Sequence, residues 1–509
     1  MTSHEGKVCK TRAGTQSEAK YSYLFLAAIY LVRISQGLFL SILSPTLLFL
    51  ADNVDSEVAS VSPMFTGKSL GFMFGSFAVG YSLRHYRPML TLGIADFLCG
   101  AFMFFIPLVK SIWWLYALVT LCGLVYGYID AAGQGLLLNI WGEERSRSLI
   151  QGYHFAFTIG AFIAPMIAKP FLEMASFIKD ADAKCPKTVS FSSHLESTTS
   201  RSNTSTEEFQ YNSTLTSVSI DTGLNPTVYV YFLFGTFAVI VSIFLFVLAA
   251  LNATKKLKQL RRKETLTLTE ERPEEPVRNI FGLLALITLF YFFLIGGEHP
   301  YIAHIFAISV CSKLHFSVSD ASINNSVFWG GYGLGRLVAV PVANYVKPGK
   351  VIMMFLAGTV LTLAIMAVFG EWVPTIWWVT TFLYGFCSSP LYPAMVSWIS
   401  QLANISGAVN NFKLALETRL YFVAGKYIFI VNLGNSIGSM SMVPVGAVIF
   451  QNKPFDLVYF SLGMGITMSI VFAVMTVYGK RYKKKIGYSK NEIKLPQLNS
   501  ELEKFTVSK

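Results

Sequence analysis

The sequence carries little charge for its length. Only 14% of its 509 residues are charged and 53% are hydrophobic, whereas soluble domains carry about 25% charge. A water-soluble core cannot bury this much apolar surface, so a soluble protein is excluded. The apolar residues fall in runs of about twenty, the length at which a helix crosses a hydrocarbon core of about 30 Å with its backbone hydrogen bonds internal.

Motifs for metal, redox or nucleotide chemistry are also missing. Cys99, Cys122 and Cys387 lie inside apolar runs, and the six cysteines show no metal or redox spacing. Cys185 and Cys311 either pair or remain free thiols. Because the sequence holds no Gly-rich phosphate loop, an ATP-driven pump is not expected. We predict no enzyme, no catalytic residue, no metal site and no cofactor, apart from a possible bound sodium ion or proton.

Twelve apolar runs have the length of membrane spans. They cover roughly residues 23–50, 62–83, 89–109, 113–140, 149–172, 227–251, 280–306, 323–345, 351–370, 376–400, 427–450 and 455–478. The sequence therefore predicts an all-α membrane protein of twelve transmembrane helices. The polar start of the chain has no apolar stretch ahead of a cleavage site, so the first span is expected to remain as an anchor.

A highly charged segment divides the spans into two groups of six. We predict a cytoplasmic N-terminal tail (1–22), a first half (23–251) with an external loop (173–226), a cytoplasmic linker (252–279), a second half (280–478) and a cytoplasmic C-terminal tail (479–509). The halves share small and aromatic residues: Gly67, Gly71 and Gly75 match Gly331 and Gly335, while Tyr126, Gly127 and Trp141 match Tyr384, Gly385 and Trp398. Internal repeats of this kind are typical of secondary transporters.

Lysine and arginine gather in the short loops on one side of the predicted membrane. They are Arg84 and Arg87, Arg145 and Arg147, the run from Lys255 to Lys263, Lys347 and Lys350, and the run from Lys480 to Lys485. By the positive-inside rule this side is the cytoplasm, so both termini are expected there. The asymmetry explains the net charge of +12, so no nucleic-acid partner is expected. The run KKLKQLRRK is interpreted as a topology signal, with contact to anionic membrane lipid as the alternative.

We expect an integral, multi-pass protein of the plasma membrane. The long polar loop, 173–226, then lies outside the cell. Its sequons at Asn203 and Asn212 are predicted glycosylation sites.

Seven segments carry a recognisable pattern. They read SPTLLFLA, GKSLGFMFGS, YIDAAGQGLLLNIWG and HFAFTIGAFIAP in the first half, and GGEHPYIAHIF, FWGGYGLGRL and the segment from Gly434 to Pro444 in the second. With them the chain resembles the major facilitator superfamily, and more narrowly the sodium-dependent glucose transporter-like branch of its fucose-symporter group. The resemblance implies the major facilitator fold in two pseudo-symmetric six-helix halves, alternating access, and a sugar-like solute carried with a cation.

Two features depart from the resemblance. The superfamily motif after span two, usually Asp-Arg followed by Gly-Arg, is reduced to Gly80, Arg84, His85 and Arg87, without an acidic residue. Residues 408–424 interrupt what resembles a continuous pattern, as either a lineage-specific insert or an error in the gene model.

Charged side chains inside spans cost about 3 kcal/mol each at mid-bilayer, so each needs a partner, a cavity or a function. Arg33 and Asp130 lie at similar depths in spans one and four. We predict an ion pair between them near the midplane of the membrane. The pair either lies within reach of the solute or only stabilises the helix bundle. In the resembling group an acidic residue at the position of Asp130 is implicated in coupling.

Glu298 and His299 follow two glycines and precede Pro300. This segment is expected to break span seven, freeing carbonyls for a cation or a sugar hydroxyl and providing a hinge for gating. The alternative is a kink at the outer end with Glu298 facing water. Because no cation is close in sequence, Glu298 suits a proton carrier, whereas an ion-paired Asp130 suits sodium or a conformational latch.

Arg336 is expected nearer the cytoplasm, latching a gate or meeting helix carbonyls, without contact to Glu298. Asp96 is interpreted as a packing residue, and His154 as either a packing residue or a ligand.

Sugar recognition needs amides that donate and accept hydrogen bonds, and aromatic faces for the sugar ring. The predicted solute-binding residues are Gln36, Asp130, Gln134, Trp329, Tyr332 and Asn435, with Tyr126, Asn139 and Tyr384 as further candidates. We predict a secondary active transporter of a monosaccharide, which the resemblance narrows to a hexose, coupled to sodium or protons. A facilitative uniporter of the same fold and a transport-dead receptor or trafficking protein are the alternatives.

Overall fold

The computed structural model describes residues 3–175, 224–251, 280–402 and 425–506, and within these ranges every element is a helix. The first half contains α1 (Ser3–Ile42), α2 (Leu47–Asn53), α3 (Val58–Val61), α4 (Pro63–His85), α5 (Pro88–Phe105), η1 (Ile106–Leu108), α6 (Ile112–Met174) and α8 (Thr227–Ala250). The second half contains α10 (Ile280–Cys311), α11 (Val318–Tyr345), α12 (Pro348–Phe369), α13 (Pro374–Ser388), α14 (Leu391–Leu402), α16 (Gly425–Asn452) and α17 (Asp456–Thr506).

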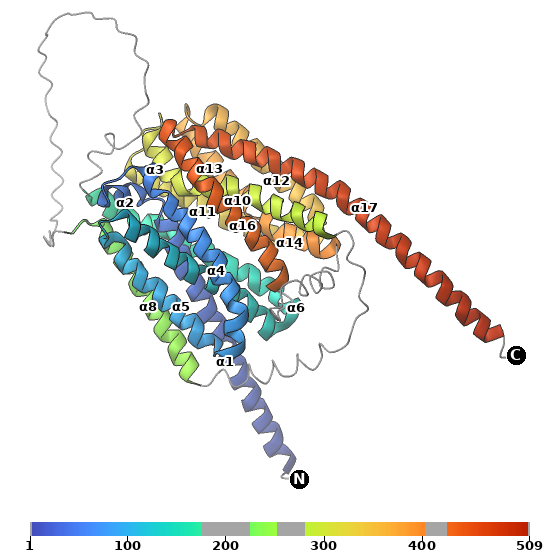
Figure 1. Cartoon of the computed structure of the whole chain (residues 1–509). Helices are drawn as coiled ribbons and strands as arrows, with labels where there is room; N and C mark the ends of the chain where they lie inside the picture. The colour runs from blue at the N-terminus through green and yellow to red at the C-terminus, as the bar shows by residue number, and fades with distance from the viewer. Residues whose placement is uncertain (1–2, 176–223, 252–279, 403–424, 507–509) are drawn as a thin grey trace, which may run out of the picture.

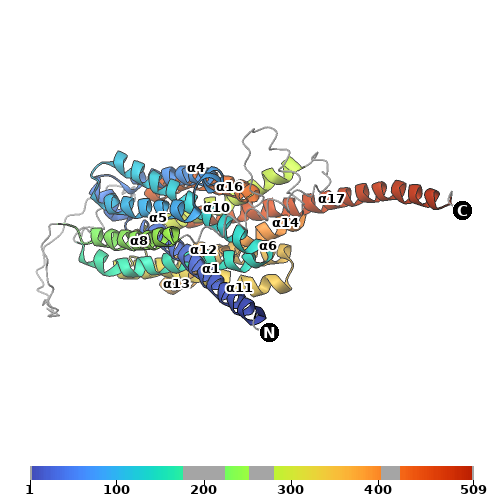
Figure 2. The same ribbon diagram turned by 90° about the horizontal axis from the view of Figure 1, so that it is seen from below.

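The helices form two groups that lie side by side (Figure 1). The N-terminal part of α1 and the C-terminal part of α17 project beyond the same end of the bundle, which we call the tail end (Figures 1 and 2). The opposite end, which holds α2, α3 and η1, is called the loop end. Nine segments of the described helices are long and apolar enough to cross a membrane. The helices α4 and α11 and the pair α13–α14 complete the bundle.

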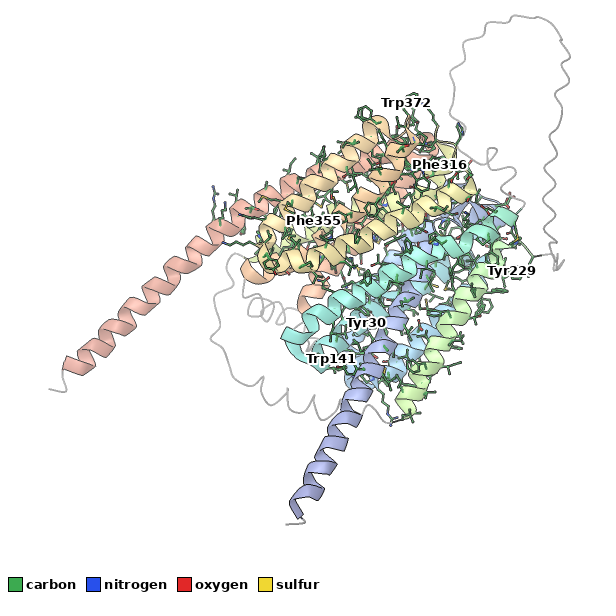
Figure 3. The ribbon with its side chains drawn as sticks, turned by 180° about the vertical axis from the view of Figure 1, so that it is seen from behind. Tyr30, Trp141, Tyr229, Phe316, Phe355 and Trp372 are labelled. Carbon is green, nitrogen blue, oxygen red and sulfur yellow. The ribbon has the colours of Figure 1, made fainter. Side chains whose placement is uncertain are left out.

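Helix α6 contains two membrane spans because it folds back on itself. The Tyr153 hydroxyl donates a hydrogen bond to the carbonyl of Ile129 at 3.0 Å, although a straight helix would hold the two residues about 36 Å apart. Trp141 lies at the turn between the two limbs (Figure 3). Residues 112–137 and 149–174 are the two spans, in agreement with the predicted spans four and five.

The helix breaks lie elsewhere than expected. Span seven was expected to break at Glu298, but α10 continues through Pro300. This expectation is wrong because a proline removes only one intrahelical hydrogen bond, and the backbone in lipid gains most by keeping the others. Span ten instead breaks between Ser388 and Leu391, at Pro390. Span one likewise ends at Ile42 and resumes as α2.

Close helix contacts repeat in the two halves. In the first half, a Cβ at Gly75 of α4 would overlap the carbonyl oxygen of Leu124; in the second, a Cβ at Gly335 of α11 would overlap that of Phe386. Side chains larger than glycine would push these helices apart.

The repeated contacts also correct the alignment of the halves. A Cβ at Gly123 would meet the backbone of Lys68, and a Cβ at Gly385 would meet the backbone of Phe328. Gly385 therefore corresponds to Gly123, and its predicted match with Gly127 is wrong by about one helical turn. The structure supports a duplicated architecture in a different register.

Candidate functional site

An ion pair lies inside the first half. The Nη2 atom of Arg33 on α1 lies 2.6 Å from Oδ1 of Asp130 on α6, and the two side chains are only 6% and 8% exposed. The predicted pairing therefore forms. Because each charge is buried, removal of either partner leaves the other uncompensated.

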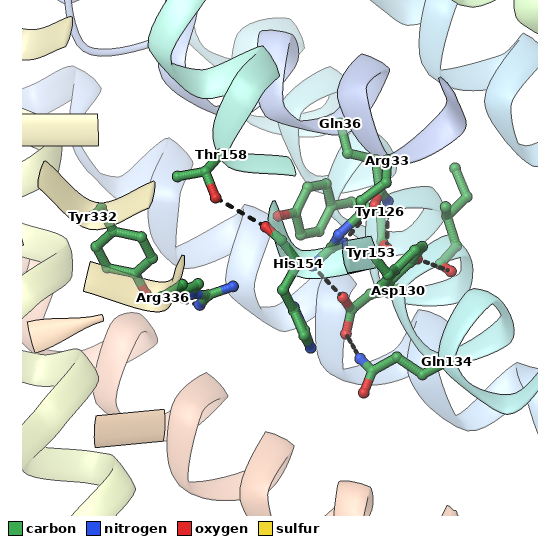
Figure 4. A network of polar contacts seen from close by, with 11 residues as sticks. Arg33, Gln36, Tyr126, Asp130, Gln134, Tyr153, His154, Thr158, Tyr332 and Arg336 are labelled. Carbon is green, nitrogen blue, oxygen red and sulfur yellow. Dashed lines mark hydrogen bonds and ion pairs between the residues drawn. The ribbon is translucent and has the colours of Figure 1, made fainter. Parts of the chain in front are cut away.

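Amide side chains extend this ion pair into a network (Figure 4). Arg33 donates from Nη1 to Oε1 of Gln36 at 2.6 Å, and Gln36 donates from Nε2 to the carbonyl of Tyr126 at 2.9 Å. Gln134 donates from Nε2 to Oδ2 of Asp130 at 3.0 Å. Both carboxylate oxygens of Asp130 thus have a partner, one a guanidinium and the other an amide.

Aromatic rings hold the Arg33 guanidinium from the sides. Its Cζ atom lies 4.7 Å from the ring centroid of Tyr153, 4.9 Å from that of Phe157 and 5.8 Å from that of Tyr126. Cation–π attraction is stronger in a desolvated site than in water. The rings and the ion pair therefore fix Arg33 together. Tyr153 was missed in the sequence, where one tyrosine among 24 carries no signal.

The second half holds a different arrangement of charges. Arg336 on α11 donates from Nη2 to the Tyr332 hydroxyl at 3.2 Å, and its Cζ lies 4.8 Å from the Tyr332 ring centroid. The Nε and Nη1 atoms of Arg336 are buried without a hydrogen-bond partner in the described part of the chain. Arg336 therefore keeps donors that a bound solute can use.

Glu298 lies on the other side of Tyr332. Its residue is 4% exposed, so the alternative of a carboxylate facing water is wrong. Its carboxylate interacts with the hydroxyls of Tyr332 and Ser388 and with the charge of Arg336. Between Glu298 and Arg336 the described residues show no direct ion pair, but the Tyr332 hydroxyl connects them. The expectation that Glu298 and Arg336 make no direct contact therefore holds among the described residues, but it missed their connection through Tyr332.

Arg336 also faces the centre of the bundle. Its charge acts on Tyr126 and His154 of the first half and on Tyr392 of the second. Figure 4 shows its guanidinium pointing toward His154. Arg336 lies further from the loop end than Glu298, as expected, and a role at a cytoplasmic gate stays a prediction.

The two halves meet at this centre through aromatic residues. The ring of Trp329 lies edge-on to Phe157, 5.6 Å between centroids, and the rings of His154 and Tyr392 are 6.2 Å apart. Nε1 of Trp329 and Oδ1 of Asn435 are buried without a partner among the described residues. Buried polar groups are normally hydrogen-bonded, so these atoms mark a place for a ligand or water.

Hydrogen bonds between the halves close the loop end. They join Ser62 to His304 at 3.1 Å, Thr66 to the carbonyl of Met440 at 3.0 Å, and Ser69 to Ser439 at 2.7 Å. His299 shares the hydroxyl of Ser439, with Nδ1 2.8 Å from Oγ. His299 is therefore part of the contact between the halves, where a gating residue is expected.

Lys68 was missed in the sequence although a charge inside a span is a usable signal. It is 8% exposed, and its ammonium lies 5.3 Å from the ring centroid of Phe65. No carboxylate pairs with it among the described residues.

Several other predicted residues lie away from this centre. Asp96 is fully buried beside the hydroxyls of Ser35 and Ser242, but both of its carboxylate oxygens lack a hydrogen-bond partner among the described residues, so its packing role stays a prediction. Cys311 is disulfide-bonded, so the alternative of a free thiol is wrong there. Outside the described residues lie Cys185, the predicted glycosylation sites Asn203 and Asn212, and the 408–424 segment; the side chain of Asn139 is likewise not described.

The fold and the buried polar centre define a class. The chain is a polytopic helical membrane protein with the major facilitator fold, and two solved structures share that fold. A D-xylose-proton symporter superposes with a TM-score of 0.60 at 11% identity, covering 89% of this chain and 97% of the symporter. The nucleoside transporter NupG superposes with a TM-score of 0.57 at 12% identity, covering 89% and 98%.

Relatives narrow this class, although no family model matches the chain. Sodium-dependent glucose transporter 1 of Homo sapiens is 29% identical over 443 residues, covering 86% of this chain and 76% of the relative. The Xenopus laevis protein of the same name is 27% identical, covering 86% and 78%. Major facilitator superfamily domain-containing protein 4A of Mus musculus is 24% identical, covering 78% and 86%. The resemblance to the superfamily and to its sodium-dependent glucose transporter-like branch is confirmed.

Proposed function

We propose that the protein is a secondary active transporter of a small polar solute, a monosaccharide and most simply a hexose, coupled to sodium or protons. The two halves would expose the central site to one side of the membrane at a time. The proposal is supported by relatives named sodium-dependent glucose transporter 1 and by a neighbour in structure named a D-xylose-proton symporter.

One observation carries the proposal. At the junction of the halves, the guanidinium of Arg336, the indole of Trp329 and the amide of Asn435 each have a buried polar atom without a partner in the described part of the chain. A sugar hydroxyl both donates and accepts, so a ring of hydroxyls can satisfy all three groups. The aromatic rings of Trp329 and Tyr332 supply apolar faces for the sugar.

The orientation and location follow the same reasoning. We propose that the tail end faces the cytoplasm, because the basic loops lie on that side, and that the protein resides in the plasma membrane. The loop end then faces outside and bears the 173–226 loop, with glycans on Asn203 and Asn212.

The experiment is uptake of labelled glucose and fucose into proteoliposomes of the purified protein that hold no sugar at the start, with a sodium gradient, a proton gradient or neither. A coupled transporter accumulates sugar only when one of the gradients is imposed. Equal uptake under all three conditions would indicate a uniporter, and no uptake of either sugar would reject sugar transport.

Arg336→Gln serves as the site variant, because it removes unpaired donors from the centre without breaking a direct ion pair. Arg87→Gln is its matched control, since Arg87 is exposed at the tail-end connection between α4 and α5. Sugar exchange that fell equally in both variants would contradict a specific role for the central site.

A further inference from the structure

A small cavity lies beside Glu298, between four helices of the second half. Its polar lining comprises Glu298 on α10, Thr359 on α12, Tyr384 and Ser388 on α13, and Ser461 on α17. Its volume is about 10 Å³, which corresponds to one species the size of a water molecule. The rest of the lining is mainly apolar, so little else competes for an occupant.

The hydroxyls in this lining present acceptors to the cavity. Thr359 donates its hydroxyl proton to the carbonyl of Phe355 at 2.8 Å, and Ser461 donates its own to the carbonyl of Gly297 at 2.9 Å. With each proton directed at the backbone, the oxygen lone pairs remain for an occupant. Oxygen acceptors around a carboxylate are the donor set of a hard cation.

Asp130 is less suited to hold a cation. Its Oδ1 accepts from Arg33 and its Oδ2 from Gln134. A cation there would have to displace a guanidinium from a 2.6 Å ion pair. The carboxylate of Glu298 has no such direct pair among the described residues, because Arg336 reaches the Tyr332 hydroxyl instead.

We propose that Glu298, Thr359 and Ser461 form the binding site of a monovalent cation, sodium, and that this cavity rather than Asp130 holds the coupling ion. A proton bound to Glu298 would need neither the cavity nor the hydroxyl lone pairs of Thr359 and Ser461, whereas a sodium ion would need both. The coupling role rests on the proposed function, whereas cation binding itself does not.

The position of the cavity gives binding a consequence at the centre. A sodium ion on the Glu298 carboxylate weakens its pull on the Tyr332 hydroxyl, which also accepts from Arg336. The Arg336 guanidinium, whose other donors face the solute position, then becomes free to shift toward the solute. Cation and solute binding are therefore coupled through one tyrosine.

The test is the sodium dependence of thermal unfolding of the full-length protein in detergent, without solute, with choline chloride holding ionic strength constant. Sodium is expected to raise the Tm of the wild type. Glu298→Gln and Thr359→Val are expected to weaken the apparent sodium affinity by about tenfold or more. Thr359→Val preserves side-chain shape, so it remains informative if Glu298→Gln fails to fold.

Two controls separate this site from the rest of the molecule. Thr467→Val removes a hydroxyl that also donates to a helix carbonyl but is exposed on α17, and should leave the sodium response unchanged. The double variant Arg33→Gln with Asp130→Asn removes both charges of the ion pair and should also retain it.

Three results would overturn the proposal: a wild-type Tm that responds to pH but not to sodium, a sodium response unchanged in both Glu298→Gln and Thr359→Val, or a response lost only in the double variant. The unfolding experiment contains no sugar, so it tests cation binding alone. A failure of the proposed sugar transport would appear only in the proteoliposome experiment.

Discussion

The two halves of the bundle treat a buried arginine in opposite ways. Arg33 contacts Asp130 directly, donates to Gln36 and lies between aromatic rings. Arg336 donates to one tyrosine hydroxyl and keeps Nε and Nη1 unpaired in the described structure. The first arrangement pairs the charge of Arg33 and leaves only its Nε without a partner among the described residues; the second leaves two donors of Arg336 unpaired. The two arginines therefore differ in how far their neighbours satisfy them.

The two halves share their helix packing and differ in the side chains at the centre of the bundle. Leu124 and Phe386 make equivalent contacts with Gly75 and Gly335, and the position six residues further along is Asp130 in the first half but Tyr392 in the second. The duplicated helices thus kept their packing while the central side chains diverged.

The largest expected effect comes from Asp130→Asn. It leaves the Arg33 charge buried without a counter-charge, which costs about 3–5 kcal/mol. Unfolding of the purified protein in detergent measures this loss, and sugar exchange should be lost with it. Asp456→Asn, at an exposed position on α17, is the control. An unchanged stability would show that the rings alone hold Arg33, and the contrast between the halves would disappear.

Arg336→Gln should affect solute binding more than folding. Losing a charged hydrogen-bond donor to the solute costs about 1.5–3 kcal/mol, so the KM for sugar should rise roughly tenfold to a hundredfold. The fall in Tm should be smaller than for Asp130→Asn, because no direct ion pair is broken. A fall as large as that of Asp130→Asn, with KM unchanged, would make Arg336 a structural residue like Arg33.

Gly75→Ala and Gly335→Ala should destabilise the protein by similar amounts. In each case the new methyl group overlaps a carbonyl oxygen of the neighbouring helix, and such overpacking costs about 1–3 kcal/mol. Thermal unfolding measures both. Gly463→Ala is the matched control, because nothing lies within 4 Å of its Cβ position. Tolerance in one half alone would contradict the shared framework.

The smallest effect is expected from two tyrosine hydroxyls. Tyr153→Phe removes a hydrogen bond of about 1 kcal/mol to the carbonyl of Ile129, whereas Tyr332→Phe removes the hydroxyl that contacts both Arg336 and Glu298. Tyr332→Phe should also weaken the dependence of sugar uptake on the cation, because it removes the link between Arg336 and Glu298. Tyr153→Phe should lower Tm only. The measurement is the cation dependence of sugar uptake in proteoliposomes. If the two variants showed the same cation dependence, a link between Arg336 and Glu298 through Tyr332 would be contradicted.

The sequence was sufficient for most of the fold. Apolar runs located the spans, since a helix needs a fixed length to cross lipid. Breaks could not be located, because Pro45, Pro300 and Pro390 look alike in sequence, yet α10 passes through its proline while the other two lie between helices. Tertiary contacts decide whether a helix tolerates a proline, and a local pattern does not contain them.

The candidate site was predicted in part. Equal depth in two spans was enough to pair Arg33 with Asp130. The same argument placed Arg336 nearer the tail end than Glu298, and their distances from the loop-end termini of α10 and α11 do differ by about 7 Å; what it missed is the indirect link between them. The Arg336 side chain and the Tyr332 ring span this difference in depth, so that the Tyr332 hydroxyl contacts both charged groups. Depth counted along the backbone does not include the length of side chains.

Three hydrogen bonds made by Ser62, Thr66 and Ser69 help to hold the two halves together at the loop end, and Gln451 and Glu57 form a further, exposed one. At about 1 kcal/mol each, the first three contribute on the order of 3 kcal/mol to the closed form, which corresponds to a roughly 150-fold preference. A ligand that binds the open form more tightly by that factor makes the two forms about equally populated at saturation, and a larger ratio reverses the balance. The hydrogen-bonded part of this closure is thus within the range that binding can offset.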